Sequence, residues 1–502
     1  MTRRHPALAG RGVLREDGGD PMSAVDIPRV LVLGGGLAGL ATALFLARRG
    51  QQVDLLERDR SAVPTGVRAA AGWHRSTVPQ SAHSHAFLAR FRQLLAAEAP
   101  DVLAGLQAAG VREIALRPPA SVPPSGPTDP EQVVLAARRP VVEWVLRRTV
   151  EKERGVRVHA GAEATGLVVS GGRVSGVHVD GGVVDADIVV DASGSRSPVP
   201  GWLAEHARPV PERSSPCGIT YYTRYWVLHR TGDPGELGRG NTAGGSFDRF
   251  SCLMFPADNG TVSITFGVLP EDRDLRELRL SEAFDAAAET IPTVARWVDS
   301  SVAVPISQVA AMTGLHNRLR TLAPDGVPVL PGLLGVGDAV CTTNPAYSRG
   351  VTLACESALA CAQAVLAHGK DPVTLAVAAD TAQQDVLAPW FHDSVAQDDA
   401  RLSRWRPEGH EPAGVPPAPG TVSNADAFLA AQRDPEVWVE FSALQNLLRK
   451  PDDVLARPDI VRRVRDVLAG QWRPVPLEAP SHDWLAATVR TMSSRRAAQI
   501  PV

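Results

Sequence analysis

The clearest pattern of hydrophobic positions in the chain lies between residues 30 and 57. Four consecutive apolar residues, Val30–Leu33, predict a strand buried on both faces, and they lead directly into the glycine-rich turn Gly34–Gly39. A largely apolar run as far as Arg49 predicts a helix that begins at this turn. A second buried strand is predicted at Val53–Glu57. Strand, glycine turn, helix and strand in this order predict a Rossmann-type dinucleotide-binding unit.

Helical and alternating patterns divide the rest of the chain into helices and strands. Helical spacing of apolar residues predicts helices at 86–109, 139–152, 278–300, 350–368, 424–439 and 440–468. Runs rich in β-branched and aromatic residues predict strands at 157–160, 219–227, 251–255, 261–268 and 333–336.

Three further strands form a predicted meander at 164–170, 173–180 and 183–190, because they are joined by the turns Gly171-Gly172 and Gly181-Gly182. Such a meander between the helix and the returning strand is unusual in nicotinamide dehydrogenases. It is typical of flavin-binding domains of the glutathione-reductase type. The pattern therefore favours FAD over NAD as the dinucleotide of the first unit.

The predicted fold class is α/β, with a glutathione-reductase-type Rossmann FAD-binding domain, an interleaved β-sheet substrate domain and a C-terminal helical segment. We expect a disordered tail at 1–27, and it remains open whether Met1 or Met22 is the natural start. The expected boundaries are 28–214 for the first part of the FAD-binding domain, with an insertion around 60–135, then 215–325 for the substrate domain, 326–370 for the last part of the FAD-binding domain, and 371–502 for the helical region, with a proline-rich linker near 406–422.

Composition narrows the functional class. The net charge of −3 gives no reason to expect a nucleic-acid partner, and no apolar run suggests an integral membrane segment. The five cysteines are scattered and include no Cys-x-x-Cys pair, so we expect neither a disulfide framework nor a zinc site. A reducing, cytoplasmic location fits this cysteine usage.

The glycine turn carries the most specific chemistry. Gly34 permits the tight turn, Gly36 lets a pyrophosphate approach the backbone, and Gly39 allows close packing of helix and strand. The first helical residues, Leu37 and Ala38, then present free N–H groups to the phosphates. Glu57 lies 18 residues after Gly39, at the place where a carboxylate accepts from a ribose hydroxyl.

Three blocks resemble one known family. They are Gly34–Gly39 with Glu57-Arg58, the helical Arg139-Pro-Val-Val-Glu143, and Gly337-Asp338-Ala339 followed by Pro345 and Gly350-Val351. Over roughly residues 28–370 the chain is similar to FAD-dependent hydroxylases and epoxidases of the para-hydroxybenzoate hydroxylase and squalene epoxidase type. Within this family it most resembles the branch of actinobacterial squalene- and polyether-epoxidase-like oxidoreductases, whose P-Q-x-x-H-x-H block is matched at 79–85. The family's glycine-rich turn is replaced here by 346–349 and its middle acidic motif by Asp191-Ala-Ser-Gly.

The resemblance assigns expected contacts to the cofactor. Glu57 is expected at the adenosine ribose, Arg58 over the adenine or its phosphate side, and Asp338 at a ribityl hydroxyl. Pro345 ends a loop so that Gly350 and Val351 open a helix whose N-terminus faces the flavin N1–C2=O edge. Arg139 is a candidate for the pyrophosphate or the ribityl chain, with the adjacent Arg138 able to exchange roles, and Arg75 is a candidate phosphate partner.

Candidate substrate residues are fewer. His83 and His85 occupy alternate positions without a visible third ligand, so we expect no metal and assign them a structural or substrate-positioning role. Alternation along 219–227 places Tyr222, Arg224 and Trp226 on one strand face and Tyr221 and Tyr225 on the other. We expect the Tyr222 face to line the substrate pocket, although ordinary sheet packing explains the aromatic residues equally well.

The expected function is that of an FAD-dependent monooxygenase, which hydroxylates or epoxidises a hydrophobic small molecule through a flavin C4a-hydroperoxide formed with O2, in specialised metabolism. NADH or NADPH is the expected reductant, used directly or through a separate flavin reductase, and no catalytic acid or base is assigned. The main alternative is an FAD-dependent reductase or desaturase of isoprenoid or polyene carbons. A halogenase is less favoured because the first lysine is Lys152 and no W-x-W-x-I-P motif occurs. A non-catalytic flavin-binding protein is the remaining alternative.

Overall fold

The computed structural model describes residues 28–119, 121–122, 131–230, 235, 237, 241–406, 419–470, 472 and 477–499. The expected tail at 1–27 and most of the expected linker near 406–422 lie outside the described residues.

A five-stranded parallel sheet forms the centre of the first domain. Its strand order is β18-β9-β1-β2-β5, and every neighbouring pair is parallel. The strands are β1 (Val30–Leu33), β2 (Val53–Glu57), β5 (Val156–Ala160), β9 (Ile188–Asp191) and β18 (Leu333–Gly335). The predicted Rossmann-type sheet is thereby confirmed.

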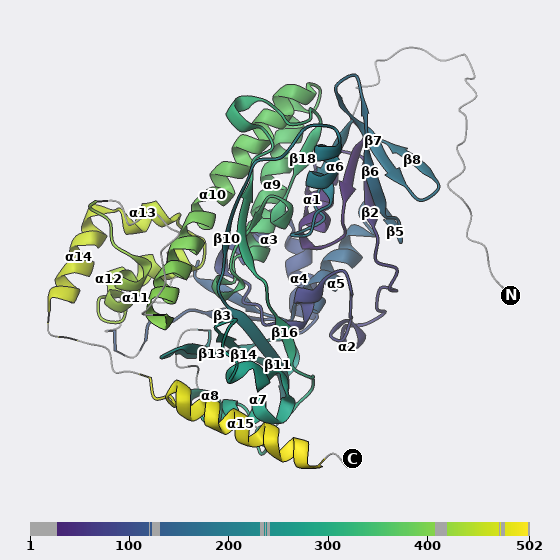
Figure 1. Ribbon diagram of the computed structural model, residues 1–502. Helices are drawn as coiled ribbons and strands as arrows, with labels where there is room; N and C mark the ends of the chain where they lie inside the picture. The colour runs from purple at the N-terminus through teal and green to yellow at the C-terminus, as the bar shows by residue number, and fades with distance from the viewer. Residues whose placement is uncertain are drawn as a thin grey trace, which may run out of the picture.

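Both faces of this sheet are covered, which explains why β1 is apolar at every position. Val30 and Val32 pack against helices α1 (Leu37–Ala47), α5 (Arg139–Val150) and α9 (Gly350–His368). Leu31 and Leu33 pack against the meander on the other face. Figure 1 shows this layering of helices, parallel sheet and meander.

The meander comprises β6 (Ala164–Ser170), β7 (Arg173–Val179) and β8 (Gly182–Asp185), in a sheet of its own. The predicted third strand at 183–190 is wrong in extent, because the chain leaves the meander after β8. The Asp187 carboxylate accepts a hydrogen bond from the Arg29 N–H at 2.9 Å, and the chain then enters the parallel sheet beside β1 as β9.

The second domain is built on an antiparallel sheet. Its main order is β12-β13-β14-β11-β15, and β16 also pairs with β11. These strands are β11 (Thr220–Leu228), β12 (Ala243–Ser246), β13 (Phe250–Pro256), β14 (Thr261–Val268), β15 (Ala303–Pro305) and β16 (Ala310–Met312). A smaller sheet consists of β10 (Glu212–Pro216), β17 (His316–Arg320) and β19 (Cys341–Thr342). In the sequence, β10 precedes the strands of the second domain, and β17 and β19 follow them.

Four predicted helices are interrupted, two of them, at 424–439 and 440–468, in the C-terminal region, where the structure has four shorter helices. The run 86–109 forms α3 (Ala89–Glu98) and α4 (Pro100–Ala108), because Pro100 begins a new helix and cannot continue the previous one. The run 278–300 forms the end of η3 (Leu275–Arg279), then α7 (Ser281–Glu289) and α8 (Pro292–Ala295). A hairpin of β3 (Arg112–Ala115) and β4 (Val133–Ala136), not predicted from the sequence, lies in the insertion.

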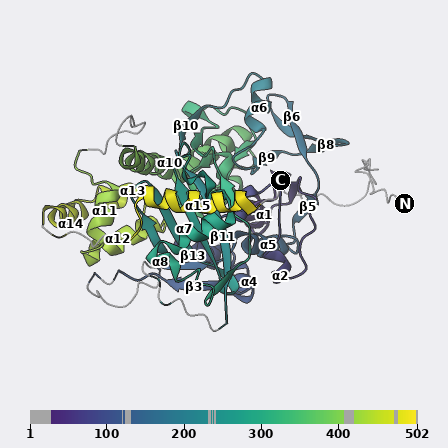
Figure 2. The same cartoon turned by 60° about the horizontal axis from the view of Figure 1, so that its bottom comes forward.

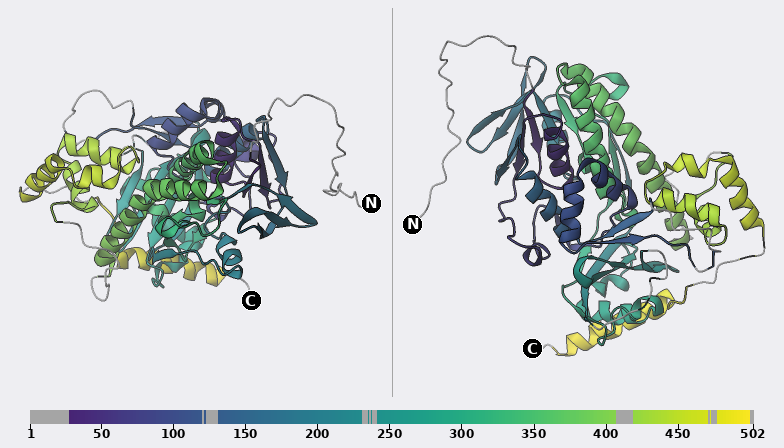
Figure 3. Two further views of the ribbon diagram at one scale, coloured as in Figure 1. Left: turned by 90° about the horizontal axis from the view of Figure 1, so that it is seen from above. Right: turned by 180° about the vertical axis from the view of Figure 1, so that it is seen from behind.

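The described elements of the C-terminal region are helices, as predicted, and they lie against three parts of the molecule. α10 (Pro372–Trp405) packs along α9, while α11 (Asn424–Ala431), α12 (Pro435–Gln445), α13 (Pro451–Leu455) and α14 (Pro458–Ala469) form a small helical unit at one side, visible in both views of Figure 3. The last helix, α15 (His482–Gln499), returns to the substrate domain and lies across α7 (Figure 2). Leu485, Ala486 and Val489 join the same core as Phe266 and Phe284.

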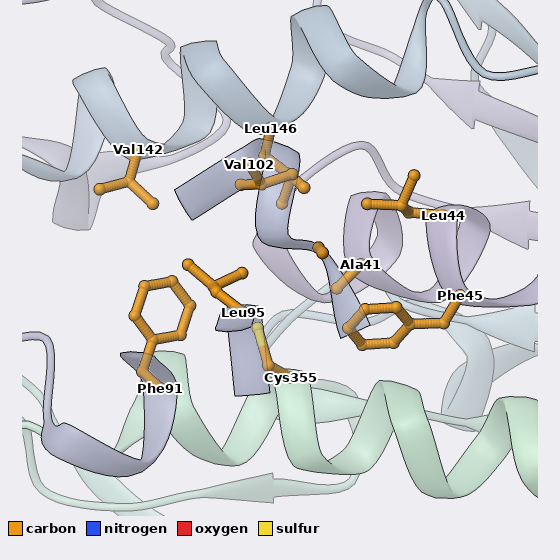
Figure 4. A pocket seen from close by; sticks show the side chains of 10 residues that line it. Ala41, Leu44, Phe45, Phe91, Leu95, Val102, Val142, Leu146 and Cys355 are labelled. Atoms are coloured by element: carbon orange, nitrogen blue, oxygen red, sulfur yellow. The ribbon is translucent and has the colours of Figure 1, made fainter. Parts of the chain in front are cut away.

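Helix α9 is the one helix of the described residues that is long and apolar enough to cross a membrane, but 67% of its apolar window is buried in the fold, as in a core helix. A small apolar cavity lies beside it, between α1, α3, α4, α5 and α9 (Figure 4). Leu44, Phe91, Leu95 and Leu146 are among its lining residues. Polar surface is absent from the lining, so this cavity is a gap in the core packing of the first domain.

Candidate flavin and substrate site

The glycine turn after β1 has the shape of a phosphate cradle. Gly34 has a φ of +104°, and a Cβ there would lie 2.7 Å from the Ala192 carbonyl oxygen. A Cβ at Gly39 would lie 1.8 Å from the Gly34 oxygen, so only glycine lets the helix begin against the turn. A Cβ at Gly36 would meet nothing within 4 Å, because that position opens away from the protein. The space that Gly36 leaves open and the first N–H groups of α1, at Leu37 and Ala38, fit a pyrophosphate.

Glu57 at the end of β2 is buried and is already held by three donors. Oε2 accepts from the Gly35 N–H at 2.9 Å and from Arg75, while Oε1 accepts from the Asp59 N–H at 2.7 Å. A carboxylate has about four acceptor positions, so one remains, on Oε1, for a ribose hydroxyl. The geometry fits the expected role of Glu57 with a single hydrogen bond.

Arg75 does not have the position expected of a phosphate partner. Its side chain is 3% exposed and is surrounded by Glu57, Asp59 and Glu143, with the Nη1–Glu143 distance at 3.0 Å. Nη1 also donates to the Gly35 carbonyl oxygen at 3.2 Å. Arg75 neutralises three carboxylates at once. It therefore links the end of β2, where Glu57 lies, to Glu143 of α5, and we call it a structural clamp. The prediction of a phosphate contact is corrected accordingly.

The neighbouring arginines at the start of α5 have separate partners. Arg138 pairs with Asp258 at 2.5 Å, in the turn between β13 and β14, and so ties the two domains together. Arg139 donates from Nε to Glu143 at 2.7 Å and from Nη1 to His85 at 3.4 Å. Arg139 is also close enough to Asp338 to lower the pKa of that carboxyl by electrostatic attraction, and its expected contact with the cofactor stays a prediction. Arg58, by contrast, is an exposed surface residue 3.6 Å from Glu163.

The distant block at residues 337–351 meets the glycine turn directly. Gly337, in η5 (Gly337–Ala339), has a φ of +58°, and a Cβ there would lie 2.8 Å from the Ala38 Cβ in the first turn of α1. The adjacent Asp338 carboxylate has no hydrogen-bond partner among the described residues, and burial raises its pKa against the attraction of Arg139. Gly350 opens α9, and a Cβ there would meet nothing within 4 Å. An unpartnered carboxylate beside two open helix starts fits the ribityl and ring parts of FAD.

A buried polar network, not predicted from the sequence, holds the loop before α9. Asn344 donates to Asp398 of α10 at 2.6 Å and accepts from the Tyr221 hydroxyl at 2.6 Å. The Tyr347 hydroxyl donates to the same Asp398 at 2.9 Å. Burial raises the pKa of Asp398, which is 1% exposed. These hydrogen bonds to α10 therefore hold the short helix η6 (Pro345–Tyr347) in place.

Arg349, the last residue before α9, completes this support. Its side chain is fully buried between the rings of Tyr347 and Trp390, at 5.1 and 4.8 Å, and it pairs with Asp393 at 2.5 Å. Ser348, just before it, has a φ of +55°, in the left-handed region that favours glycine. The sequence signals this arrangement only as a departure from the family's glycine-rich turn.

The segment after η1 (Pro79–Ala82) lies against the substrate sheet. His83 is 7% exposed, and its Nδ1 lies 3.0 Å from the Thr223 hydroxyl of β11. The Tyr225 hydroxyl donates to the His83 carbonyl oxygen at 2.7 Å. Tyr221, Thr223 and Tyr225 therefore form the β11 face that meets the first domain.

The opposite face of β11 carries the three residues expected in the substrate pocket. Tyr222 and Trp226 pack into the core under α7, and Arg224 pairs with Asp285 of that helix. The alternation is as predicted, but the chosen face is the wrong one. The helices α7 and α15 cover it, and their apolar residues need an apolar face to pack on.

Two imidazoles in this segment are neutral. Burial lowers the pKa of His83 to about 4 and, together with repulsion from Arg139, that of His85 to about 3. The Nδ1 of His85 lies 2.9 Å from the His83 carbonyl oxygen, which can only accept, so Nδ1 carries the proton. The Nε2 of His85 is then the acceptor for Arg139. The pair Arg139–His85 thus joins the cofactor cradle to the hydroxyl-bearing face of β11.

Known proteins resemble the chain at both the sequence and the fold level. A family model described as FAD dependent oxidoreductase matches residues 29–145. Protein Rv3254 of Mycobacterium tuberculosis is 29% identical over 352 residues, which are 64% of this chain and 70% of the relative. The kynurenine 3-monooxygenase of Salinispora arenicola is 26% identical over 444 residues, covering 82% of this chain and 92% of the relative. The structure of CmlS, a flavin-dependent halogenase, matches with a TM-score of 0.57 at 19% identity, covering 94% of this chain and 78% of CmlS, and at that identity it shows the fold alone.

Proposed function

We propose that this chain, an FAD-dependent oxidoreductase of the monooxygenase-like type, hydroxylates or epoxidises a hydrophobic small molecule with O2, using electrons from NADH or NADPH. The match to a kynurenine 3-monooxygenase over most of both chains supports the monooxygenase reaction. The choice between direct reduction and a partner flavin reductase, a place in specialised metabolism and a cytoplasmic location are parts of the same proposal.

One observation carries the proposal. The first domain carries the open starts of α1 and α9, the unpartnered Asp338 and Arg139, and Arg139 contacts His85, two residues after the His83 that lies against Thr223 of β11. A cofactor cradle and a second sheet joined in this way support the proposal of a redox cofactor and a substrate that bind next to each other. A structural or regulatory flavin protein would not need the second surface.

The residues of the chain would bind and orient the cofactor. Glu57 and Asp338 would accept from its hydroxyls, Arg139 would contact its ribityl or phosphate part, and the α9 N-terminus would stabilise negative charge on its ring. A helix N-terminus stabilises negative charge there by about 0.5–2 kcal/mol. Bound FAD, once reduced, supplies the activation of O2. The Tyr225–His83 hydrogen bond and the Arg138–Asp258 ion pair hold the two domains together beside these residues.

Isotope labelling tests the proposal. FAD-loaded protein is incubated with NADH or NADPH, a panel of apolar aromatic and polyene compounds, and 18O2, and products are analysed by mass spectrometry. Incorporation of one 18O atom into a product is expected. Full conversion under strict anaerobiosis would refute the monooxygenase reaction and favour the reductase or desaturase alternative.

A halogenase is the second candidate, because CmlS has this fold. The family resemblance implies that halogenases use a lysine early in the chain, whereas the first lysine here is Lys152, an exposed residue just after α5. Parallel reactions with chloride or bromide in place of the halide-free buffer decide between the two. A product that gains halogen but no 18O would overturn the proposed oxygen transfer.

A further inference from the structure

A chain of hydrogen-bonded hydroxyls ends on the imidazole of His83. The Ser84 and Thr265 hydroxyl oxygens are 2.7 Å apart, those of Thr265 and Thr223 are 2.8 Å apart, and Thr223 lies 3.0 Å from the His83 Nδ1. Thr223 and Thr265 are opposite each other on β11 and β14. The two strands thus place both hydroxyls directly under the segment that carries the histidine.

The other ring nitrogen of His83, Nε2, is without a hydrogen-bond partner among the described residues. Each hydroxyl in the chain can donate or accept, so the whole chain can point in either direction. If it donates toward Nδ1, Nε2 carries the proton and is a donor. If it points away, Nε2 is an acceptor. His83 can therefore bind either a carbonyl or a hydroxyl oxygen without a change in its charge.

The charged groups around this segment are already paired. Arg139 is bound to Glu143 and His85, and Arg138 is bound to Asp258. On β11, the neutral Thr223 bonds the His83 ring and the neutral Tyr225 bonds its carbonyl oxygen, and Thr223 in turn bonds the neutral Thr265 of β14. A carboxylate brought here would be buried without a counter-charge, which is strongly unfavourable. An uncharged oxygen would keep one hydrogen bond.

We propose that His83 is the substrate-positioning residue of this site and that it selects an apolar molecule carrying an uncharged hydroxyl or carbonyl oxygen, in preference to a carboxylate. This inference rests on the proposed function, because it places the substrate between the cofactor cradle and β11. Thr223 acts through His83 by fixing its Nδ1, so that Nε2 faces the substrate.

Matched ligands test the inference by binding rather than by turnover. Three aromatic frameworks, naphthalene, biphenyl and trans-stilbene, are each presented as the hydrocarbon, the phenol and the carboxylate. Dissociation constants come from the change in the visible absorbance of the FAD-loaded protein. The variants are His83→Phe and Thr223→Val, with Thr220→Val as the matched control, because Thr220 lies on the same strand but bonds Thr313 instead.

We expect the phenol to bind about 5- to 10-fold more tightly than its hydrocarbon. The carboxylate should bind at least 10-fold more weakly than the phenol. His83→Phe should abolish the phenol preference, Thr223→Val should reduce it to about 2-fold, and Thr220→Val should leave it unchanged. The FAD spectrum of each variant reports whether it folds.

Tighter binding of the carboxylate, a phenol preference that survives His83→Phe, or no binding of any ligand to FAD-loaded protein would overturn the inference. A phenol preference that depends on His83, without 18O incorporation, would instead refute the proposed function and leave the binding role of His83 intact.

Discussion

The buried pair Arg349–Asp393 offers the sharpest test of how the cofactor site is held. Arg349 is fully buried, stacks between Tyr347 and Trp390, and pairs with Asp393 at 2.5 Å. Asp393 also accepts from Gln397 at 2.7 Å and from Asn424 of α11. The pair therefore connects the start of α9 to both α10 and the small C-terminal helical unit. We predict that Arg349→Met weakens FAD binding indirectly, because Arg349 supports the loop at 344–349 that precedes α9.

The expected free-energy cost of Arg349→Met is the cost of breaking a buried ion pair, reduced by two other effects. Removal of one partner from a buried ion pair costs about 3–5 kcal/mol. Two opposing effects reduce it: Asp393 keeps two amide donors, and the substitution removes the Nε and Nη1 groups of Arg349, which are buried without acceptors. A net loss of about 2 kcal/mol remains. If the loop at 344–349 must be ordered to bind FAD, the dissociation constant should rise by about 30-fold.

The assay is titration of the apoprotein with FAD, followed by quenching of flavin fluorescence, together with hydrogen exchange of residues 343–352. The double variant Arg349→Met/Asp393→Asn should recover most of the affinity, because it leaves no buried charge unpaired. Lys450→Met is the matched control, since Lys450 pairs with Asp385 on the same α10 but at the surface. An Arg349→Met protein with unchanged exchange at 343–352 and an FAD affinity within threefold of the wild type would refute the reasoning.

Three further predictions concern residues of the candidate cofactor and substrate site. Gly337→Ala should weaken FAD binding at least 10-fold, because its Cβ would meet Ala38, whereas Gly326→Ala, also at positive φ (+76°) but in open space, should not; equal effects in the FAD titration would contradict this. Arg75→Met should destabilise the protein by about 3–5 kcal/mol in urea unfolding, because it leaves three carboxylates together, and a loss below 1 kcal/mol would show that Arg75 is not the clamp. The pKa of His83 is lowered to about 4 in the folded state, so the unfolded chain binds more protons between pH 6.5 and 4. The contribution of neutral His83 to the free energy of unfolding should be complete above pH 6.5 and should fall by about 3 kcal/mol as the pH drops to 4. The variant His83→Gln should lose this part of the pH dependence. The same slope in His83→Gln would assign it to other groups, His85 among them.

The cofactor half of the site was predictable because its chemistry is local in sequence. A Cβ would clash with the backbone at Gly34 and at Gly39, whereas at Gly36 it would meet no protein atom and would only occupy the space left open for the phosphates. The start of α9 at Gly350 was predicted to the residue. The third strand of the meander was extended too far because no glycine or proline interrupts Val183–Val190, and only pairing with β1 decides where one sheet ends and the next begins.

The supporting residues were not predictable in the same way. Arg75 is only a candidate phosphate partner on the sequence, and the structure places it among three carboxylates instead. Its role depends on Glu143, which lies 68 residues away in the chain. Arg349 and Asp398 form their contacts through α10, a helix that is not among those predicted from the sequence. Polar networks of this kind leave no periodic signal, since each member is specified by a partner in another element.

The two faces of β11 show most clearly where sequence reasoning reaches its limit. Alternation correctly separates Tyr222, Arg224 and Trp226 from Tyr221 and Tyr225, but both sets contain aromatic residues, so periodicity cannot say which set faces the cofactor. The choice is made by elements far along the chain, α7 and the returning α15, which need an apolar surface and bury Tyr222 and Trp226. Thr223 breaks the aromatic pattern on the other face, where a large apolar side chain would displace His83. A hydroxyl residue does not reveal this face by itself, because Thr220 lies on the opposite face of the same strand; the contact of Thr223 with His83 depends on a segment 140 residues away in the chain.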